Sequence, residues 1–195
     1  MRQFLFSILI YVGLNIQAVA NDFDKGVAAY SINNYQAAIE FWTPIAERGD
    51  SLAQYNLGVV YEYGEGVAQD PKAAVKWYTL AAEQGDTTAQ FNLGLIYRNG
   101  KGIPQNYKTA VKWYTFAAEQ QYAKAQYNLG LMYYNGEGFQ QNFIYAYMWA
   151  NISASKGNKL ALNLRELLAR KMSLSQIEEA QILAKKCVKK HYKAC

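Results

Sequence analysis

The chain has 195 residues, of which 51% are hydrophobic and 18% are charged, and its formal net charge is +5. A length of this order suffices for one domain with one continuous core. Its only histidine, His191, lies near the C-terminus, which argues against histidine-based hydrolysis and histidine metal sites. Charge is uneven: residues 21–155 hold nine Lys and Arg against twelve Asp and Glu, whereas residues 156–195 hold ten against three.

Residues 1–20 differ in character from the rest of the chain. Arg2 is followed by an apolar run over residues 4–14 and by Ala18-Val19-Ala20. A charged start, an apolar region of this length and an A-x-A site are typical of a cleavable secretory signal. The run is shorter than the about 20 residues that span a bilayer, and an uncleaved anchor is the alternative. We expect the mature chain to begin near Asn21 and to work in the periplasm or outside the cell.

Residues 21–53 form a shortened first unit. Residues 37–42 match residues 73–78 at a distance of 36 positions, but the unit lacks the pair of glycines found in the next copies. Three full copies then follow at residues 54–89, 90–125 and 126–161, with a period of 36 and no insertion or deletion. Self-similarity at such a period predicts a solenoid, in which one supersecondary unit stacks on copies of itself.

Each copy predicts two helices. In the first copy, Leu57, Gly58 and Tyr61 recur at helical spacing, and Gly64 and Gly66 favour the left-handed conformations of a helix end and its turn. Asp70 is suited to an N-cap, and proline at position 71 to the first helical position. We call the two predicted helices of each copy helix A and helix B.

The predicted core alternates small and large residues. We interpret the tryptophans of helix B as core residues that fill the gap between neighbouring helices, and the glycines of helix A as points of close approach. These positions are Trp77, Trp113 and Trp149, and Gly58, Gly94 and Gly130.

The pattern Y-N-L-G-x-x-Y-x-x-G-x-G-V-x-x-D-x-x-K-A-x-x-W-Y-x-x-A-A resembles the Sel-one-like repeat, a relative of the tetratricopeptide repeat. The resemblance covers residues 54–161, whereas residues 21–53 are more similar to a plain tetratricopeptide unit. It implies an all-α fold, a right-handed α-solenoid of stacked helix pairs, with a scaffold or partner-binding role. It also places the chain with exported bacterial members of the family.

Residues 162–195 are expected to form C-terminal capping helices. Ser175-x-x-Glu178 matches a capping box and predicts the start of the last helix. Cys187 and Cys195 are the two cysteines, and on one unbroken helix they would lie about 12 Å apart, beyond the reach of a disulfide. A bond therefore requires the helix to end near Lys190 and the tail to fold back. Free thiols and an intermolecular bridge are the alternatives.

Catalytic and metal-binding patterns are scarce, and we predict neither an enzyme nor a cofactor or metal site. The one motif that suggests catalysis is Ser153-Ala154-Ser155-Lys156, an S-x-x-K like that of penicillin-recognising enzymes. It falls at the end of a helix B, and neither S-D-N nor K-T-G accompanies it. We therefore do not predict a nucleophile here.

The side of helix A that faces away from the predicted core is the better candidate for function. In tetratricopeptide-like solenoids this side lines the concave surface, and here it would offer aromatic residues with amides and one arginine, suited to a peptide or a helix. The alternative is that the aromatic residues pack on neighbouring helices and the asparagines bond to backbone. The candidates are Tyr55, Asn56, Glu62, Tyr63, Phe91, Asn92, Arg98, Asn99, Tyr127, Asn128, Tyr134 and Asn135. Positions that change between copies, such as Glu62 and Arg98, are predicted to be freest of structural contacts.

We predict an exported repeat scaffold that mediates protein-protein interaction through its concave face, with a protein or peptide partner and no nucleic acid. No transmembrane segment is expected in the mature chain, and the sequence leaves the oligomeric state open. One alternative function is an enzyme or binder of β-lactam or cell-wall substrates. Another is an envelope-associated structural protein that uses its basic C-terminus.

Overall fold

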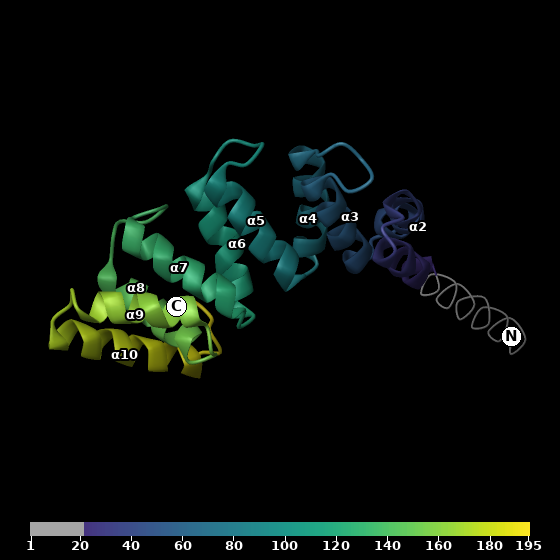
Figure 1. The fold of residues 1–195 in the computed structure, drawn as a ribbon. Helices are drawn as coiled ribbons and strands as arrows, with labels where there is room; N and C mark the ends of the chain where they lie inside the picture. Colours follow the sequence, from purple (N-terminus) through teal and green to yellow (C-terminus); the bar gives the residue numbers. More distant parts are fainter. Residues whose placement is uncertain (1–21) are drawn as a thin grey trace, which may run out of the picture. The chain divides into compact units, whose positions relative to one another are not determined.

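The computed structural model describes residues 22–195, so the predicted signal peptide at residues 1–20 lies outside the described residues. All regular secondary structure in the described part is helical, which confirms the predicted all-α class (Figure 1). The chain divides after Asp86 into two compact units. In the first unit, helical residues 22–31 precede α2 (Tyr35–Glu47), α3 (Ser51–Tyr63) and α4 (Pro71–Glu83).

The second unit contains the six remaining helices of the described chain. They are α5 (Thr87–Asn99), α6 (Tyr107–Glu119), α7 (Ala123–Asn135), α8 (Phe143–Ala154), α9 (Lys159–Ala169) and α10 (Leu174–Lys189). Helices α3, α5 and α7 begin at Ser51, Thr87 and Ala123, each 36 residues after the previous one, and each is followed by its helix B. The helix A and helix B of the pairs α3–α4, α5–α6 and α7–α8 pack along each other.

Side-chain caps begin the B helices, as their sequences predict. Asp70 accepts hydrogen bonds from the backbone N–H groups of Lys72 and Ala73, both at 3.0 Å, and Asn106 and Asn142 cap α6 and α8 in the same way. Gly64 ends α3 with a φ of 73° and Gly66 follows at 74°, so both adopt the left-handed region that glycine tolerates.

An aromatic residue of helix B covers the glycine of its own helix A. A Cβ atom at Gly58 would lie 2.5 Å from Cδ1 of Tyr78, and one at Gly94 would lie 2.4 Å from Cδ1 of Tyr114. The tryptophans Trp77, Trp113 and Trp149 are buried, as predicted, but they are not the residues nearest to the helix A glycines. Tyr78 and Tyr114, which follow Trp77 and Trp113 in the sequence, make the close contacts with the glycines.

The α7–α8 pair lacks this ring. Ala150 stands where Tyr114 stands 36 residues earlier, and the helices themselves come close. A Cβ atom at Gly130 would lie 3.1 Å from the backbone oxygen of Ala146 and 3.3 Å from the backbone nitrogen of Ala150. Glycine is therefore suited to this position because the backbone of α8 approaches it directly.

The last helix begins two residues earlier than predicted. Ser173, not Ser175, is its N-cap: its hydroxyl accepts from the N–H of Gln176, and the Gln176 side chain accepts from the N–H of Ser173. Both serines fit the capping-box pattern, and the earlier one gives a longer helix that places Ile177 against the core.

The C-terminal tail folds back onto α10. The helix ends at Lys189, and a disulfide joins Cys187 to Cys195 with a Cα–Cα distance of 5.3 Å. The fold-back also places the ammonium group of Lys193 2.7 Å from a carboxylate oxygen of Glu119 on α6. The tail is thereby held to the body of the second unit at two points.

Candidate functional site

The twelve predicted binding residues divide between the two units. Tyr55, Asn56, Glu62 and Tyr63 lie on α3 in the first unit, and the other eight lie on α5 and α7 in the second. Each unit therefore presents its own candidate surface.

In the first unit, two of the four candidates make contacts within the unit. The ring of Tyr55 packs against that of Tyr78 at a centroid distance of 5.8 Å, and Glu62 accepts a hydrogen bond of 2.7 Å from the Tyr78 hydroxyl. Tyr55 and Asn56 also line a hollow of about 280 Å³. Tyr63, at 63% exposure, is the candidate with the most accessible side chain.

In the second unit, Arg98 is at the centre of a polar network. Its guanidinium group binds both carboxylate oxygens of Glu137, at 2.7 and 3.3 Å, and donates to Asn128 Oδ1 at 3.2 Å. Asn135 donates to the same carboxylate at 2.8 Å, and the buried Asn128 amide donates to the backbone oxygen of Lys124. The prediction that Arg98 is free of structural contacts is therefore wrong.

The remaining candidates on α5 and α7 range from half-buried to exposed. Phe91 lies between the rings of Tyr114 and Tyr122, at 5.8 and 5.2 Å, and Tyr134 stacks on Phe143 at 5.7 Å. Tyr127 packs beside the core of the α8–α9 region. Asn92 is half-buried and Asn99 is exposed.

The structure brings three of these candidates together in a cavity, which we call the α7 pocket. Its volume is about 450 Å³, within the range of small-molecule and side-chain binding sites. It is lined by Phe91, Ala123, Lys124, Tyr127, Asn128, Lys156, Gly157, Asn158 and Leu160. The aromatic and leucine side chains form apolar walls, and no carboxylate belongs to the lining.

Sequence reasoning missed the residues that α9 and its preceding turn contribute to this pocket. Leu160, at 60% exposure, occupies the repeat position that Lys124 occupies 36 residues earlier. This replacement of a lysine by an exposed leucine is the feature of the sequence that could have indicated the pocket. The ammonium group of Lys156 donates to the backbone oxygen of Gln121 at 3.1 Å and lies 4.3 Å from the ring centre of Tyr192. Burial lowers the pKa of Lys156 from its usual value.

The S-x-x-K motif has a structural role. Ser153 is fully buried and its hydroxyl donates to the backbone oxygen of Ala123 at 2.6 Å, which ties α8 to α7. Because Ser153 is buried, a substrate cannot reach its hydroxyl. The ammonium group of Lys156 is bonded to the backbone oxygen of Gln121 and does not act as a base for this serine. Within residues 22–195, no group of three or more His, Cys, Asp or Glu side chains is placed to hold a metal ion. None of the described helices combines the length and hydropathy needed to cross a membrane.

The model of the Sel1 repeat matches the chain four times, at residues 24–50, 51–86, 87–122 and 123–158. The chain belongs to the Sel1 repeat family. The four matched segments include the shortened first unit, so the Sel1 pattern extends to the part that is more similar to a plain tetratricopeptide unit by sequence. Proteins with this repeat generally serve as scaffolds for protein interaction.

Two solved Sel1-type structures are similar to this chain. A Sel1 repeat protein from Oxalobacter formigenes is 34% identical with a TM-score of 0.65, and the match covers 85% of this chain and 75% of that one. A protective antigen of uropathogenic Escherichia coli strains with an SLR fold is 28% identical with a TM-score of 0.53; the match covers 89% of this chain. This chain spans only 46% of that antigen's structure. No curated protein matches the chain.

Proposed function

We propose that this Sel1 repeat chain is an exported scaffold that binds a protein partner, and that the α7 pocket receives an apolar side chain of that partner. The observation that carries the proposal is the convergence of Phe91, Tyr127 and Leu160 on one cavity of about 450 Å³. Three apolar walls around an open cavity suit a side chain presented by a peptide or helix better than a fully enclosed small molecule. Family membership supports a scaffold role.

The polar groups of the pocket favour one orientation of the partner. Lys124 and Lys156 belong to the lining, and no Asp or Glu does. A carboxylate next to the inserted side chain would therefore be attracted, whereas a neighbouring lysine of the partner would be repelled.

Export from the cytoplasm is supported by the charged start, the apolar run and the A-x-A site of residues 1–20. The disulfide between Cys187 and Cys195 fits a protein that matures in an oxidising compartment. Its site of action would then be the periplasm or the cell exterior.

Affinity capture from an envelope extract tests the proposal. The bait is the mature chain beside a Lys124→Glu, Leu160→Asp double variant. Both side chains are exposed, so both substitutions should leave the fold intact. The control is Lys108→Glu with Leu174→Asp, which makes the same chemical changes at exposed positions outside the pocket lining. Circular dichroism checks that all three proteins fold.

The proposal predicts a protein that the wild type and the control retain and that the pocket variant loses. Retention of the same proteins by all three baits would contradict a role for the α7 pocket. Capture of nothing by the wild-type bait would count against a stable partner in the envelope.

A further inference from the structure

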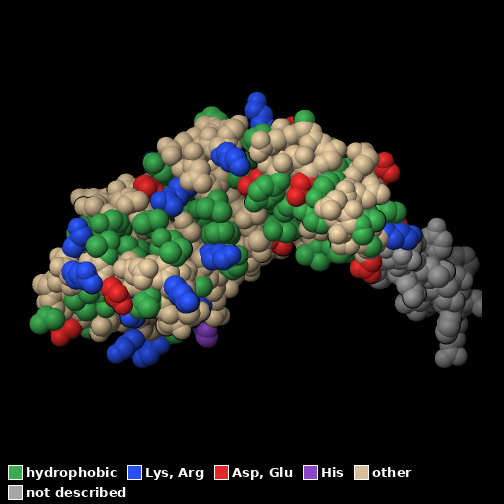
Figure 2. Space-filling view, viewed as in Figure 1, with side chains coloured by type: hydrophobic (Ala, Val, Ile, Leu, Met, Phe, Trp, Pro, Cys, Tyr) green, Lys and Arg blue, Asp and Glu red, His purple; other side chains and the backbone are tan. Residues whose placement is uncertain are grey.

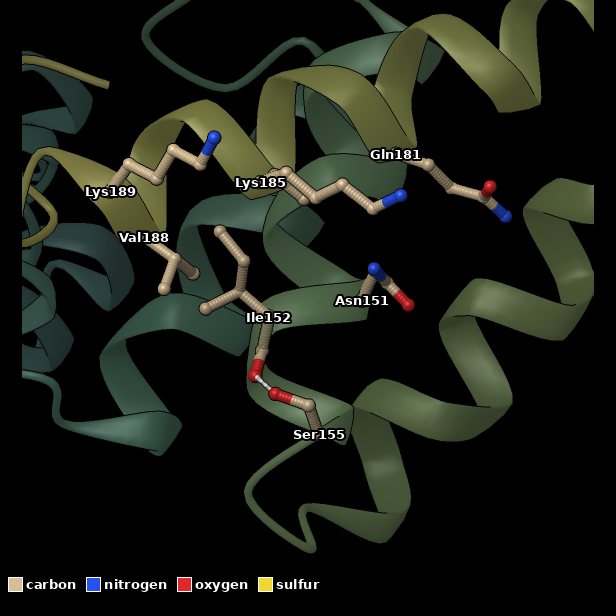
Figure 3. Close-up of a pocket in the computed structure, with 8 residues that line it drawn as sticks. Asn151, Ile152, Ser155, Gln181, Lys185, Val188 and Lys189 are labelled. Atoms are coloured by element: carbon tan, nitrogen blue, oxygen red, sulfur yellow. Dashed lines mark hydrogen bonds between the residues drawn. The ribbon is translucent and has the colours of Figure 1, made fainter.

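A second cavity lies between α8 and α10, and we call it the α10 groove (Figure 3). Its volume is about 480 Å³. It is lined by Asn151 and Ile152 of α8, by Ser155 at the C-cap of α8, and by Gln181, Ala184, Lys185, Val188 and Lys189 of α10. It shares no lining residue with the α7 pocket, so it can be tested independently of the proposed function.

The groove is open because the last two helices do not form a pair like the earlier ones. Residues 64–70 separate α3 from α4, whereas only residues 170–173 separate α9 from α10. Helices α9 and α10 each pack on α8 but not along each other. The groove therefore lies where α10 crosses the side of α8 that carries Asn151 and Ile152.

The floor of the groove is apolar and recessed. Ile152 and Ala184 are only 3% and 4% exposed and lie below the rim, while Val188, at 46% exposure, forms one edge. The methylene stems of Lys185 and Lys189 extend the apolar surface upward from α10.

The polar groups that face the groove are mainly hydrogen-bond donors. The Oδ1 atom of Asn151 already accepts a bond from Arg165 of α9 at 3.2 Å, which leaves its NH₂ group available. The Ser155 hydroxyl donates to the backbone oxygen of Ile152 at 2.7 Å and is occupied. Figure 3 shows Lys185, Gln181 and Asn151 projecting toward the same opening.

The charge of the groove has no internal counterion. Within residues 22–195, neither Lys185 nor Lys189 has an ion-pair partner, and no Asp or Glu lines the cavity. Lys185 with Lys189 and Lys186 with Lys190 are like-charge pairs four residues apart, an arrangement that destabilises a helix. Blue side chains gather over the α8–α10 end of the second unit in Figure 2. An anionic partner would remove this repulsion.

We infer that the α10 groove binds an acidic peptide segment of a partner protein. An apolar side chain of the segment lies on Ile152, Ala184 and Val188, and flanking carboxylates bind the ammonium groups of Lys185 and Lys189. A donor from Asn151 can complete the recognition of one carboxylate. A membrane surface fits less well, because a flat array of lipid headgroups cannot reach a floor that is recessed between two helices.

Selection from a displayed library of random 16-residue peptides on the mature chain tests this inference. The expected result is enrichment of sequences that combine Asp or Glu with Leu, Ile or Phe. One enriched peptide is then titrated by fluorescence polarisation against the wild type, a Lys185→Glu, Lys189→Glu variant and a Lys186→Glu, Lys190→Glu variant. The two lysine variants change the net charge equally at the same end of the chain, but only Lys185→Glu with Lys189→Glu alters residues that line the groove.

The Lys185→Glu, Lys189→Glu variant should weaken peptide binding by at least about tenfold. The Lys186→Glu, Lys190→Glu control should weaken it by less than about threefold, because it leaves the groove lining intact and reduces only the long-range attraction of the peptide. The Lys124→Glu, Leu160→Asp variant of the α7 pocket should bind the peptide as the wild type does. Equal weakening by the two lysine variants would overturn the inference, because it would show attraction to the basic helix as a whole.

Two further outcomes would also overturn the inference. One is the absence of enriched acidic peptides from the selection. The other is binding of phosphatidylglycerol vesicles, lost in the groove variant, without saturable binding of any acidic peptide; this would assign the lysines to a membrane surface.

Discussion

The ring of Tyr114 lies directly on Gly94, so closely that a Cβ atom there would come within 2.4 Å of the ring. Gly94→Ala should therefore destabilise the second unit by about 1–3 kcal/mol, the usual cost of overpacking a core. Urea denaturation followed by circular dichroism measures the change. In a Tyr114→Ala background the added methyl group meets no ring, so Gly94→Ala should there be neutral or stabilising through helix propensity. Additive effects of the two substitutions would contradict the contact.

Arg98 should contribute to stability and not only to a surface. Arg98→Ala removes the partner of a half-buried Glu137 carboxylate and should lower the free energy of unfolding by about 2 kcal/mol. Lys101→Ala, on an exposed turn, is the control and should change it by less than about 0.5 kcal/mol. Equal, small effects of both substitutions in urea denaturation would show that the ion pair contributes nothing measurable.

Alkaline pH should destabilise the second unit through Tyr114. Burial raises the pKa of its phenol above the usual value of about 10, while the nearby Arg98 guanidinium offsets part of the shift. Above pH ~10 the unfolded chain releases this proton and the folded chain keeps it. The contribution of the protonated Tyr114 phenol to the free energy of unfolding is therefore complete below pH ~10 and is lost as the pH rises. The free energy of unfolding can fall by at most about 1.4 kcal/mol per pH unit through the titration of this one group.

Tyr114→Phe isolates this effect because it removes only the hydroxyl. That oxygen is buried and, within the described residues, accepts or donates no hydrogen bond of good geometry, so the variant should be at least as stable as the wild type at pH 7. Unfolding free energies from urea titrations at pH 8 to 11 should fall less steeply for the variant. Parallel curves would contradict a raised pKa at this site.

Loss of the disulfide should release the C-terminal tail. Closing the short loop between Cys187 and Cys195 is worth about 2–3 kcal/mol by the chain-entropy relation, and opening it also frees Lys193 from Glu119. Cys195→Ser should therefore lower the unfolding temperature to the value of the reduced wild type. The intact mass of the untreated mature protein should lack the two thiol hydrogens; a mass with both thiols present would contradict the bond.

The fold was predictable because its signals are local and repeated. A 36-residue period, an Asp or Asn cap before each helix B and a glycine pair after each helix A fix where helices begin and end. Two details were not decidable in this way. Ser173 and Ser175 both fit a capping box, and Trp113 and Tyr114 are neighbours in one buried stripe, so only the packing shows which ring covers Gly94.

The candidate site was less predictable, because its contacts join residues far apart in the sequence. Variation between repeats at Glu62 and Arg98 suggested freedom from structural contacts, but each has a specific partner: Tyr78 for the first, and Glu137, 39 residues away, for the second. Leu160 lines the α7 pocket from α9, a helix that begins at the very end of the third repeat. A helical wheel drawn on one repeat cannot show such contributions.

The most direct test of the proposed scaffold role is photo-crosslinking from the α7 pocket. The crosslinking amino acid p-benzoylphenylalanine replaces Leu160 in one protein and Leu174 in another, both of which are exposed side chains of the second unit. Irradiation in an envelope extract should give a discrete adduct from position 160, diminished by excess unlabelled mature chain, and no such adduct from position 174. Identical adducts from both positions, or none from position 160, would contradict partner binding at the α7 pocket.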